Sequence, residues 1–570
     1  MTPSPRPVDR LLRGVGAAVF VAATLVNVFC LASTWHPMPL LDSWESIADY
    51  QEYLAHGLDW TQIFALHNEH RIAPSKLLTL LDYRFFAGTG LLLVATNVVL
   101  SILSADILCV HSGVDSADAP PVLRLLFAAA IGTSVAQIAN LVWAFQTSWY
   151  FALFLSMLAF RAYQRGAHVG SPVRSGTWTV AAWTLGVAAT FSNANGQLVW
   201  PVLLVIGFAM RRRWRVQLAS AALGACVIAL YFHGYRAPPQ HPPLTRALHE
   251  PLDLARFVAV YATNAIQIVG VRAQVIIGAV LVLGSLVWTL RSVAQRVDAA
   301  TGRVFAGAVL LFLLATASIT AVGRLGLGGH EYADSSRYVS YGLFLLVAAA
   351  LLLAAHVPHA VLRRRVLLGS WTALVVVATW TGLAGAPYAE ARYMRQVLLD
   401  ASACDAVRAC PDDVLFRVYP DAPRARERLS FLRAYRLAPY APHVARRVPE
   451  RALLPLPHVR DLAACEGRID AVDAMRDGTR QLRGWMIWPG ERRRLPDAIG
   501  VYTLDGARLG GGGLAESRVD VQRQLRLRFA SAIRLYGFHA WARDLPEQFC
   551  AVGFFGGDAC KLTFPAPPRT

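Results

Sequence analysis

The sequence contains few charged residues for its length, because only 16% of its 570 residues are Asp, Glu, Lys or Arg. With 55% hydrophobic residues and a mean hydropathy of +0.40, this scarcity excludes an ordinary soluble protein. Acidic residues are fewer than basic residues, at 37 against 55, which gives a formal net charge of +18. The arginines cluster in short segments between apolar runs, which is how membrane orientation is encoded, so we expect no nucleic-acid partner.

Motifs for metal binding and for signal-peptide cleavage are also missing. No C-x-x-C pair occurs, and the two histidines of His67-Asn-Glu-His70 lack the H-E-x-x-H spacing, so we expect neither a metal site nor another cofactor. The basic residues 1–13 and the apolar run after them resemble a signal peptide, but no A-x-A-like cleavage site follows. The sequence therefore predicts a first helix that is retained.

Long apolar runs dominate the first two thirds of the chain. Several are long enough, or nearly so, to cross about 30 Å of hydrocarbon as a helix: residues 14–33, 90–110, 216–232, 304–322 and 339–355. Two further runs, 121–136 and 142–160, require a short polar turn at 137–140 between them. We count about eleven transmembrane helices, the last at 366–383. The expected fold of residues 1–385 is an all-α polytopic membrane domain.

Arginine clusters predict how these helices are oriented. Arg6, Arg10 and Arg13 place the N-terminus in the cytoplasm by the positive-inside rule. Later clusters fall on alternate connections: Arg161, Arg165 and Arg174; Arg211, Arg212, Arg213 and Arg215; Arg291, Arg296 and Arg303; Arg363, Arg364 and Arg365. An odd number of helices then places the C-terminal region in the periplasm of a bacterial inner membrane. The outer connections are residues 35–88, 192–200, 233–267 and 323–337.

The C-terminal region, from residue 386 on, lacks long apolar runs. Residues 386–466, with the helix-forming stretch 422–435, are expected to form a mainly helical linker region. Alternating stretches at 481–487, 498–503 and 519–528 predict a β-rich domain over residues 467–570. Turn signals separate the stretches: Pro489-Gly490, Asp505-Gly506 and the glycine run 510–513. We expect a small antiparallel sandwich, and therefore an α+β C-terminal region.

Five of the eight cysteines lie in this C-terminal region, where an oxidising compartment permits disulfides. The nearest neighbours along the chain are Cys404 with Cys410 and Cys550 with Cys560, which leaves Cys465 without a neighbour. Spacing alone leaves the connectivity open.

The first outer connection holds the densest set of reactive side chains. Asp42, just beyond the first helix, is a candidate catalytic base near the lipid headgroups, and it also fits the N-cap of a short helix. Glu69 is a candidate second acid, with a salt bridge to Arg71 or Lys76 as the alternative.

Other residues of the outer connections are candidate substrate ligands: Glu45, His67, His70, Arg71, Lys76, Asn195, Arg324, Arg337 and Tyr338. The cations suit a lipid phosphate. Alternatives are snorkelling to the interface for Lys76, and pairing with Glu331 or Asp334 for Arg324 and Arg337. Glu45 also fits the solvated face of a short helix, and the amide of Asn195 fits either a sugar hydroxyl or a turn.

These motifs resemble the GT-C superfamily of membrane glycosyltransferases, which includes protein O-mannosyltransferases and the aminoarabinose transferases that modify lipid A. Asp42 matches the acidic position of the first outer loop. The segment His70-Arg-Ile-Ala-Pro74-Ser-Lys76 looks like the second motif, and Ser336-Arg337-Tyr338 looks like the Arg-Tyr start of a late helix. Two departures are Asp-Ser-Trp-Glu in place of adjacent acids and His-Asn-Glu-His-Arg in place of His-Pro-Pro.

The resemblance implies a GT-C-like enzyme that moves a sugar from a polyprenyl-phosphate donor to a glycan, lipid or protein acceptor, with inversion at the sugar. Membrane lipids are the other expected partners. The alternatives are a transporter or flippase of lipid-linked glycans and a non-catalytic scaffold with a glycan-binding tail. A transporter needs ionisable residues near the bilayer midplane, where candidates such as Asp106 are few.

Overall fold

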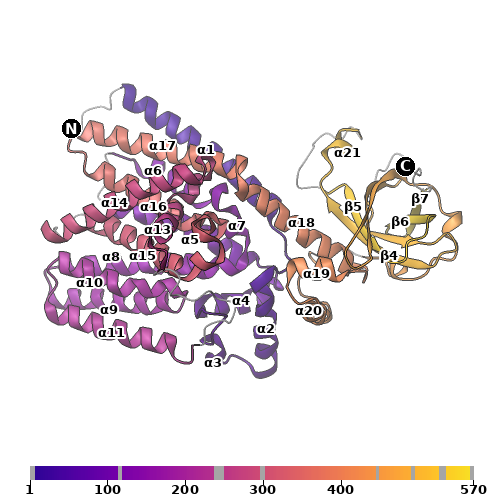
Figure 1. Ribbon diagram of the computed structural model, residues 1–570, viewed down its shortest axis with the longest axis horizontal. Helices are drawn as coiled ribbons and strands as arrows, with labels where there is room; N and C mark the ends of the chain where they lie inside the picture. Colours follow the sequence, from indigo (N-terminus) through magenta and orange to yellow (C-terminus); the bar gives the residue numbers. More distant parts are fainter. Residues whose placement is uncertain are drawn as a thin grey trace. The chain divides into compact units, whose positions relative to one another are not determined.

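The chain folds into two compact units of different architecture. The computed structural model describes residues 7–112, 118–235, 249–295, 302–444, 448–489, 494–524 and 535–564. Unit 1 comprises Met1–Leu31, Ala55–Leu80 and Leu92–Ala391, and unit 2 comprises Ala32–Leu54, Leu81–Leu91 and Arg392–Thr570. Unit 1 is helical, whereas unit 2 combines helices with a β-sheet (Figure 1). Unit 2 thus includes two short segments that the sequence assigned to the membrane domain.

Apolar helices make up most of unit 1 and identify the chain as a multi-pass membrane protein. In the described residues, nine are long and apolar enough to cross a membrane: Pro7–Thr34, Leu91–His111, Pro121–Val142, Trp214–Phe232, Pro251–Val269, Val271–Arg291, Gly302–Asp334, Ser336–Ala355 and Ala360–Ala384. The predicted polytopic helical domain is confirmed. By these criteria the count is lower than about eleven, because α8 (Thr147–His168) and α9 (Pro172–Thr190) are less apolar and α10 (Val199–Ala209) is short.

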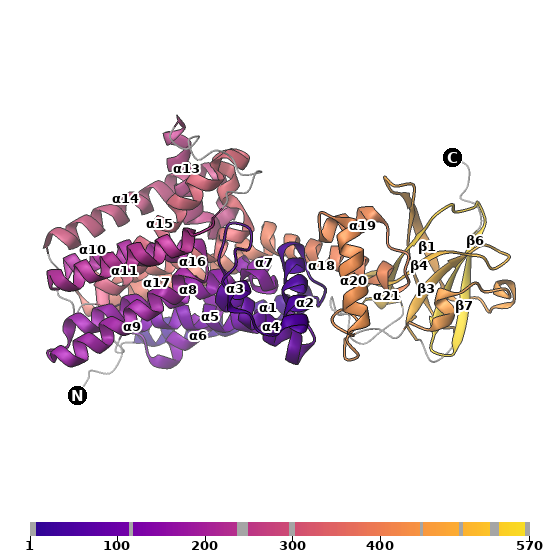
Figure 2. The same ribbon diagram turned by 90° about the horizontal axis from the view of Figure 1, so that it is seen from below.

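The helices within and beside these spans have the following bounds: α1 (Pro7–Thr34), α2 (Glu45–His56), α3 (Trp60–Ile63), α4 (Ala73–Phe86), α5 (Leu91–His111), α6 (Pro121–Gly132), α7 (Ile138–Val142), α11 (Trp214–Phe232), α13 (Pro251–Thr263), α14 (Val271–Gln295), α15 (Gly302–Gly328), α16 (Val339–Ala355) and α17 (Ala360–Ala384). Helices α8, α9, α10 and α11 lie side by side (Figures 1 and 2).

The predicted polar turn at 137–140 is wrong, because Gln137 and Asn140 are buried inside the helical bundle. The two predicted runs are separated instead at residues 143–146, before α8, and the span Pro121–Val142 has an internal break at Thr133, between α6 and the 3-10 helix η2 (Val135–Gln137). Gln137 Nε2 donates to the carbonyls of Ile131 and Gly132, at 2.9 and 3.2 Å, and so satisfies backbone groups that the break exposes. Irregular backbone at membrane depth requires such partners, which explains why the polar side chains point inward.

Several arginine-rich segments meet at shared helix ends. Arg212, between α10 and α11, donates to Gly166 O at 2.6 Å and to Ser175 Oγ at 3.2 Å, so it lies beside the α8–α9 connection. Arg364 and Arg365, near the start of α17, pair with Asp9 in the first turn of α1 at 3.3 and 3.4 Å. These contacts agree with basic connections that alternate along the chain, and the side of the membrane stays a prediction.

Unit 2 begins its C-terminal part with helices and ends in a sheet. The helices are α18 (Ala386–Ala406), α19 (Asp412–Val418) and α20 (Ala422–Ala434), as the sequence predicts. The strands are β1 (Glu466–Ala474), β2 (Arg480–Ile487), β3 (Ala498–Tyr502), β4 (Arg508–Glu516), β5 (Gly537–Ala542), β6 (Phe549–Phe555) and β7 (Asp558–Phe564). They form one antiparallel sheet in the order β1-β2-β5-β4-β3-β6-β7, in place of the two packed sheets of a sandwich.

Two local predictions for this sheet are wrong. The glycine run 510–513 lies inside β4, in the middle of the sheet, and does not form a turn. A Cβ on Gly511 would lie 2.5 Å from Ile499 O, and one on Gly513 would lie 3.6 Å from Ala403 Cβ of α18, so the glycines let the neighbouring strand and α18 pack directly on β4. Residues 519–524 form the helix α21 (Val519–Gln524), whereas a strand was expected, and residues 525–528 lie outside the described part.

The disulfides join Cys404 to Cys410 and Cys465 to Cys560. The second pairing corrects the expected neighbour pair, because Cys550 on β6 faces Thr563, whereas Cys560 on β7 faces Gly553. Ala464 forms a bridge to Lys561, which brings Cys465 beside Cys560. The disulfide therefore ties the start of β1 to β7 at the other edge of the curled sheet.

Candidate functional site

Segments from the four predicted outer connections contact one another in unit 1. The first connection meets the residue just before the second, where Ala73 N donates to Phe191 O at 2.9 Å. It meets the third through Arg71 and the end of α11, and the fourth through an ion pair between Glu69 and Arg324. The candidate residues of this unit thus gather at one end of the helices.

A tight turn presents Glu69. The backbone N–H of His67 donates to His70 O at 2.7 Å, and that of His70 donates to His67 O at 3.0 Å. Asn68 supplies the positive φ of 53° that the turn needs, which asparagine tolerates better than most residues. The His67 ring packs against Phe145, with 5.0 Å between ring centroids. The turn is thereby held against the bundle, with Glu69 at its tip.

Glu69 forms an ion pair with Arg324, near the C-terminal end of α15. The Nε2 atom of His70 lies 3.5 Å from the same carboxylate, and only 15% of the Glu69 side chain is exposed. Arg324 is therefore a partner of Glu69, and it was not among the expected alternatives of Arg71 and Lys76. Such a carboxylate can position the guanidinium for a second, external anion.

The Arg71 guanidinium group mainly binds backbone carbonyls of neighbouring segments. Its Nε donates to Tyr231 O at 2.8 Å, and its two terminal nitrogens donate to the carbonyls of Phe64 and His233. The Tyr231 hydroxyl in turn accepts from Arg71 N at 3.1 Å. Three of the five guanidinium N–H groups are used in this way, which leaves two for any substrate.

Lys76 does not snorkel to an interface. It lies on α4 with 7% of its surface exposed, and its Nζ donates to Gln62 O at 3.1 Å. Burying an ammonium group costs free energy unless the group is well paired. The surrounding residues therefore hold the Lys76 ammonium group in place.

Asn195 lies in the 3-10 helix η4 (Ala194–Leu198) and is buried. Its Nδ2 donates to the Tyr341 hydroxyl at 2.8 Å, and that hydroxyl donates to Trp149 O at 2.9 Å. The Asn195 Oδ1 atom is buried without a hydrogen-bond partner among the described residues. Asn195 is thus rigidly held and keeps one acceptor for a hydroxyl or a water.

Arg337 and Tyr338 lie in the 3-10 helix η7 (Ser336–Tyr338), directly before α16. Arg337 is half-buried and has no ion-pair or hydrogen-bond partner in the described part of the chain. Arg337, Arg324 and Glu69 are all close enough to the Tyr338 hydroxyl to act on it electrostatically. The Tyr338 ring stacks on Tyr261 with 5.1 Å between centroids. The expected alternative partner Asp334 is instead bound by Gln274, at 2.9 Å.

Unit 2 contains the other two candidates, Asp42 and Glu45. Asp42 is the second residue of the 3-10 helix η1 (Leu41–Trp44), so it does not occupy the N-cap position, which is Leu40. Leu41 has a positive φ of 47°, an unusual conformation for leucine that often marks a functional turn.

Glu45 binds Arg428 of α20 with both carboxylate oxygens, at 3.2 and 2.8 Å. It also accepts a hydrogen bond from Tyr419, whose ring lies 5.1 Å from the Arg428 guanidinium. Arg428 is 6% exposed. Glu45 therefore fastens α2 to α20 and is not a solvated surface acid.

Sequence reasoning missed the tyrosines that support these residues. Tyr231 anchors Arg71, Tyr341 holds Asn195, and Tyr235 lies near both Glu69 and Arg324. Burial, together with the charge of Glu69, raises the pKa of Tyr235, which keeps its hydroxyl protonated. Tyrosines at the ends of apolar runs are an interfacial signal that could have identified them.

Among the described residues no group of three or more His, Cys, Asp or Glu is placed to hold a metal ion.

No model of a known protein family matches the sequence, and no curated protein matches it. Two solved structures are similar to the chain: ArnT from Cupriavidus metallidurans bound to undecaprenyl phosphate, and ArnT from the same organism in the apo state. The first is 16% identical with a TM-score of 0.33, and the match covers 73% of this chain and 87% of that chain. The second is 16% identical with a TM-score of 0.31, and covers 74% and 87%.

Proposed function

We propose that the chain is a membrane glycosyltransferase that moves a sugar from polyprenyl phosphate to an acceptor on the periplasmic face of a bacterial inner membrane. The observation that supports this most directly is the half-buried Arg337, which has no partner in the described residues and, like Arg324 and Glu69, acts electrostatically on Tyr338. Two cations and one carboxylate leave a net positive charge at the end of apolar helices. That charge suits the phosphate of a lipid whose chain lies among them.

In the proposed reaction, an acceptor hydroxyl attacks the anomeric carbon of the donor sugar. A new carbon–oxygen bond forms while the bond from that carbon to the phosphate oxygen breaks, and its electron pair leaves with polyprenyl phosphate. Asp42 takes the hydroxyl proton, and Arg324 and Arg337 stabilise the charge of the departing phosphate. Attack opposite the leaving group inverts the anomeric centre. Glu69 orients Arg324 and is a second candidate acid.

A transporter or flippase of lipid-linked glycans is the second candidate function, because the bundle buries several polar side chains. Asn27, Gln137 and Asn140 are examples, but each donates to backbone or side-chain groups of neighbouring helices. Asp106 pairs with Arg124 at 2.9 Å. These residues therefore stabilise the broken helix, whereas the unpartnered Arg337 favours an anion-binding enzyme.

The proposal predicts phosphate-dependent lipid binding. Full-length protein in detergent should bind undecaprenyl phosphate at least tenfold more tightly than undecaprenol, measured by the change in intrinsic tryptophan fluorescence. The Arg337→Gln variant should lose roughly tenfold or more of the affinity for the phosphate, since a charge-assisted hydrogen bond contributes about 1.5–3 kcal/mol. Its affinity for undecaprenol should not change.

Arg272→Gln is the matched control, because Arg272 is an exposed arginine at the start of α14 in the same unit. It should bind undecaprenyl phosphate as the wild-type protein does. Equal affinity of the wild-type protein for the phosphate and the alcohol would overturn the proposal, and so would equal losses in the two arginine variants.

A further inference from the structure

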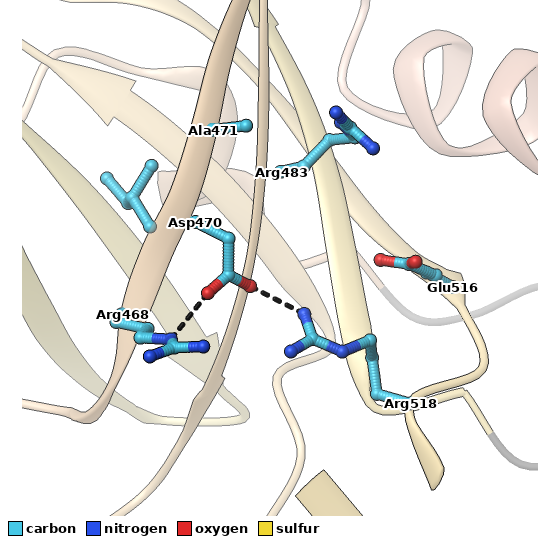
Figure 3. A pocket seen from close by; sticks show the side chains of 7 residues that line it. Arg468, Asp470, Ala471, Arg483, Glu516 and Arg518 are labelled. Atoms are coloured by element: carbon cyan, nitrogen blue, oxygen red, sulfur yellow. Dashed lines mark hydrogen bonds and ion pairs between the residues drawn. The ribbon is translucent and has the colours of Figure 1, made fainter. Parts of the chain in front are cut away.

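A polar cavity of about 600 Å³ lies on the C-terminal sheet of unit 2 and has no role in the proposed transfer reaction. Its charged lining is Arg468 and Asp470 from β1, Arg483 from β2, Glu516 at the end of β4, and Arg518 just after it. Asp470 lies between the guanidinium groups of Arg468 and Arg518 (Figure 3). The volume falls within the range of small-molecule sites.

Two irregularities of strand pairing supply the carboxylates of this cavity. The β1–β2 register shifts between Ile469 and Ala471, so Asp470 is the extra residue of a bulge. The β4–β5 register shifts between Leu514 and Glu516 in the same manner. Bulges re-aim side chains and are frequent next to binding sites. Both acids of the cavity therefore stand beside positions where the sheet departs from regular pairing.

The arginines of the cavity keep unused donors. Arg468 contacts Asp470 only through Nε, and Arg483 contacts Asp473 through Nε and NH2, at 3.0 and 2.9 Å. Within the described ranges, the remaining guanidinium N–H groups of these two arginines have no partner. Arg518 differs, because both Asp470 and Asp520 bind it. Arg468 and Arg483 are therefore the residues that can donate to a ligand.

Glu516 supplies an acceptor that is held in place from behind. The Nδ1–H group of the buried His539 of β5 donates to Asp400 of α18 at 2.7 Å, and its Nε2 lies 3.9 Å from Glu516 Oε2. This Nε2 is buried and makes no hydrogen bond within the described residues. The neighbouring His539 lowers the pKa of Glu516 despite partial burial, so the carboxylate is ionised at neutral pH.

Gly537 keeps the cavity open on the side of β5. A Cβ at this position would lie 2.9 Å from Arg518 Cγ and 3.0 Å from Glu516 Oε2. The cavity is thus bounded by the guanidinium donors of Arg468 on β1 and Arg483 on β2, by the carboxylate acceptor of Glu516 on β4, and by Gly537 on β5.

We propose that this cavity binds a sugar that carries a carboxylate or a phosphate group. The guanidinium N–H groups of Arg468 and Arg483 that are not used by Asp470 and Asp473 favour an anion. A bare anion would meet Glu516 and Asp470 as well, so the ligand needs hydroxyl groups that donate to these acceptors. An acidic sugar provides both groups, with its anion on Arg468 and Arg483 and a hydroxyl on Glu516. This site is separate from the proposed transfer chemistry and does not depend on it.

The full-length protein in detergent can be titrated calorimetrically with glucuronate, glucose 6-phosphate, glucose and inorganic phosphate. Glucuronate, glucose 6-phosphate or both should bind at least tenfold more tightly than glucose and than inorganic phosphate. Arg483→Gln should weaken binding of the acidic sugar at least tenfold, and Glu516→Gln should weaken it while leaving inorganic phosphate no worse bound.

Arg494→Gln is a close control, because Arg494 also pairs with one exposed aspartate, Asp558, and is equally exposed, at 43% against 44% for Arg483. It should bind the acidic sugar as the wild-type protein does, and the two arginine variants should keep the wild-type melting temperature. Binding of neither acidic sugar above the level of glucose would overturn the proposal. Equal binding of inorganic phosphate, or equal losses in Arg483→Gln and Arg494→Gln, would also overturn it. Because lipid binding through Arg337 is measured separately, failure here leaves the proposed transferase untouched.

Discussion

Replacing Asp42 with asparagine is expected to lower kcat for sugar transfer by about 10²–10⁴-fold, the usual contribution of a general base. Asparagine has nearly the same shape but cannot take the acceptor proton. The positive φ of Leu41 shows that the turn before Asp42 is specified by the fold, and Asp42 is not the N-cap of that turn. The measurement is release of undecaprenyl phosphate from a panel of undecaprenyl-phosphate-linked sugars, with a membrane extract as the acceptor source.

Glu52→Gln is the control for this substitution. Glu52 is an exposed acid on α2, close in sequence to Asp42, and its neutralisation should leave kcat within about twofold of wild type. The Asp42→Asn variant should also keep its melting temperature, because the Glu45–Arg428 pair that fastens α2 is untouched. Full activity of Asp42→Asn would exclude Asp42 as the base.

Raising the pH from 6.5 to 9.5 is expected to destabilise unit 2 by roughly 3 kcal/mol through His539. Burial by itself lowers the pKa of this histidine, but the hydrogen bond to Asp400 and charge interactions with Asp400 and Glu516 outweigh burial and raise it to about 9. The ordinary value is 6.5. Because the folded pKa is the higher one, the contribution is complete below about pH 6.5 and is lost as the pH rises through 9.

Calorimetric melting of the full-length protein across this pH range tests the prediction. The transition of unit 2 should move to lower temperature as the pH rises, and His539→Gln should remove most of this slope. Asp400→Asn should lower the stability at pH 6.5 and flatten the same profile, because it removes the main partner of the imidazolium. A wild-type melting temperature that is constant between pH 6.5 and 9.5 would contradict the protonated assignment of His539.

The sequence by itself determined the features that depend on local pattern. Apolar runs of about twenty residues can be satisfied only as helices in a hydrocarbon environment, so the membrane domain follows from hydropathy. Arginine clusters such as Arg212 with its neighbours, and Arg364 with Arg365, lie at helix ends as expected. Alternating residues predicted β2 and β3 within one residue of their observed bounds.

Only the tertiary structure decided which distant residues meet. Nothing in the local sequence pairs Glu69 with Arg324, Glu45 with Arg428, or Cys465 with Cys560, because each contact depends on the packing of separate helices or on strand order. Local signals were even misleading where tertiary packing overrode them. Glycines that signal a turn in isolation lie in the middle of a sheet here, since α18 and the adjacent strands need their missing side chains.

In the candidate site, too, the sequence determined which residues are present, and the tertiary structure determined which of them are paired. The sequence placed its acids, histidines and arginines in the outer connections, because charge is excluded from apolar helices. The fold then separated their roles by the partners that it supplies. It gave Arg71 three backbone carbonyls and Lys76 another, paired Arg324 with Glu69, and left Arg337 without a partner among the described residues.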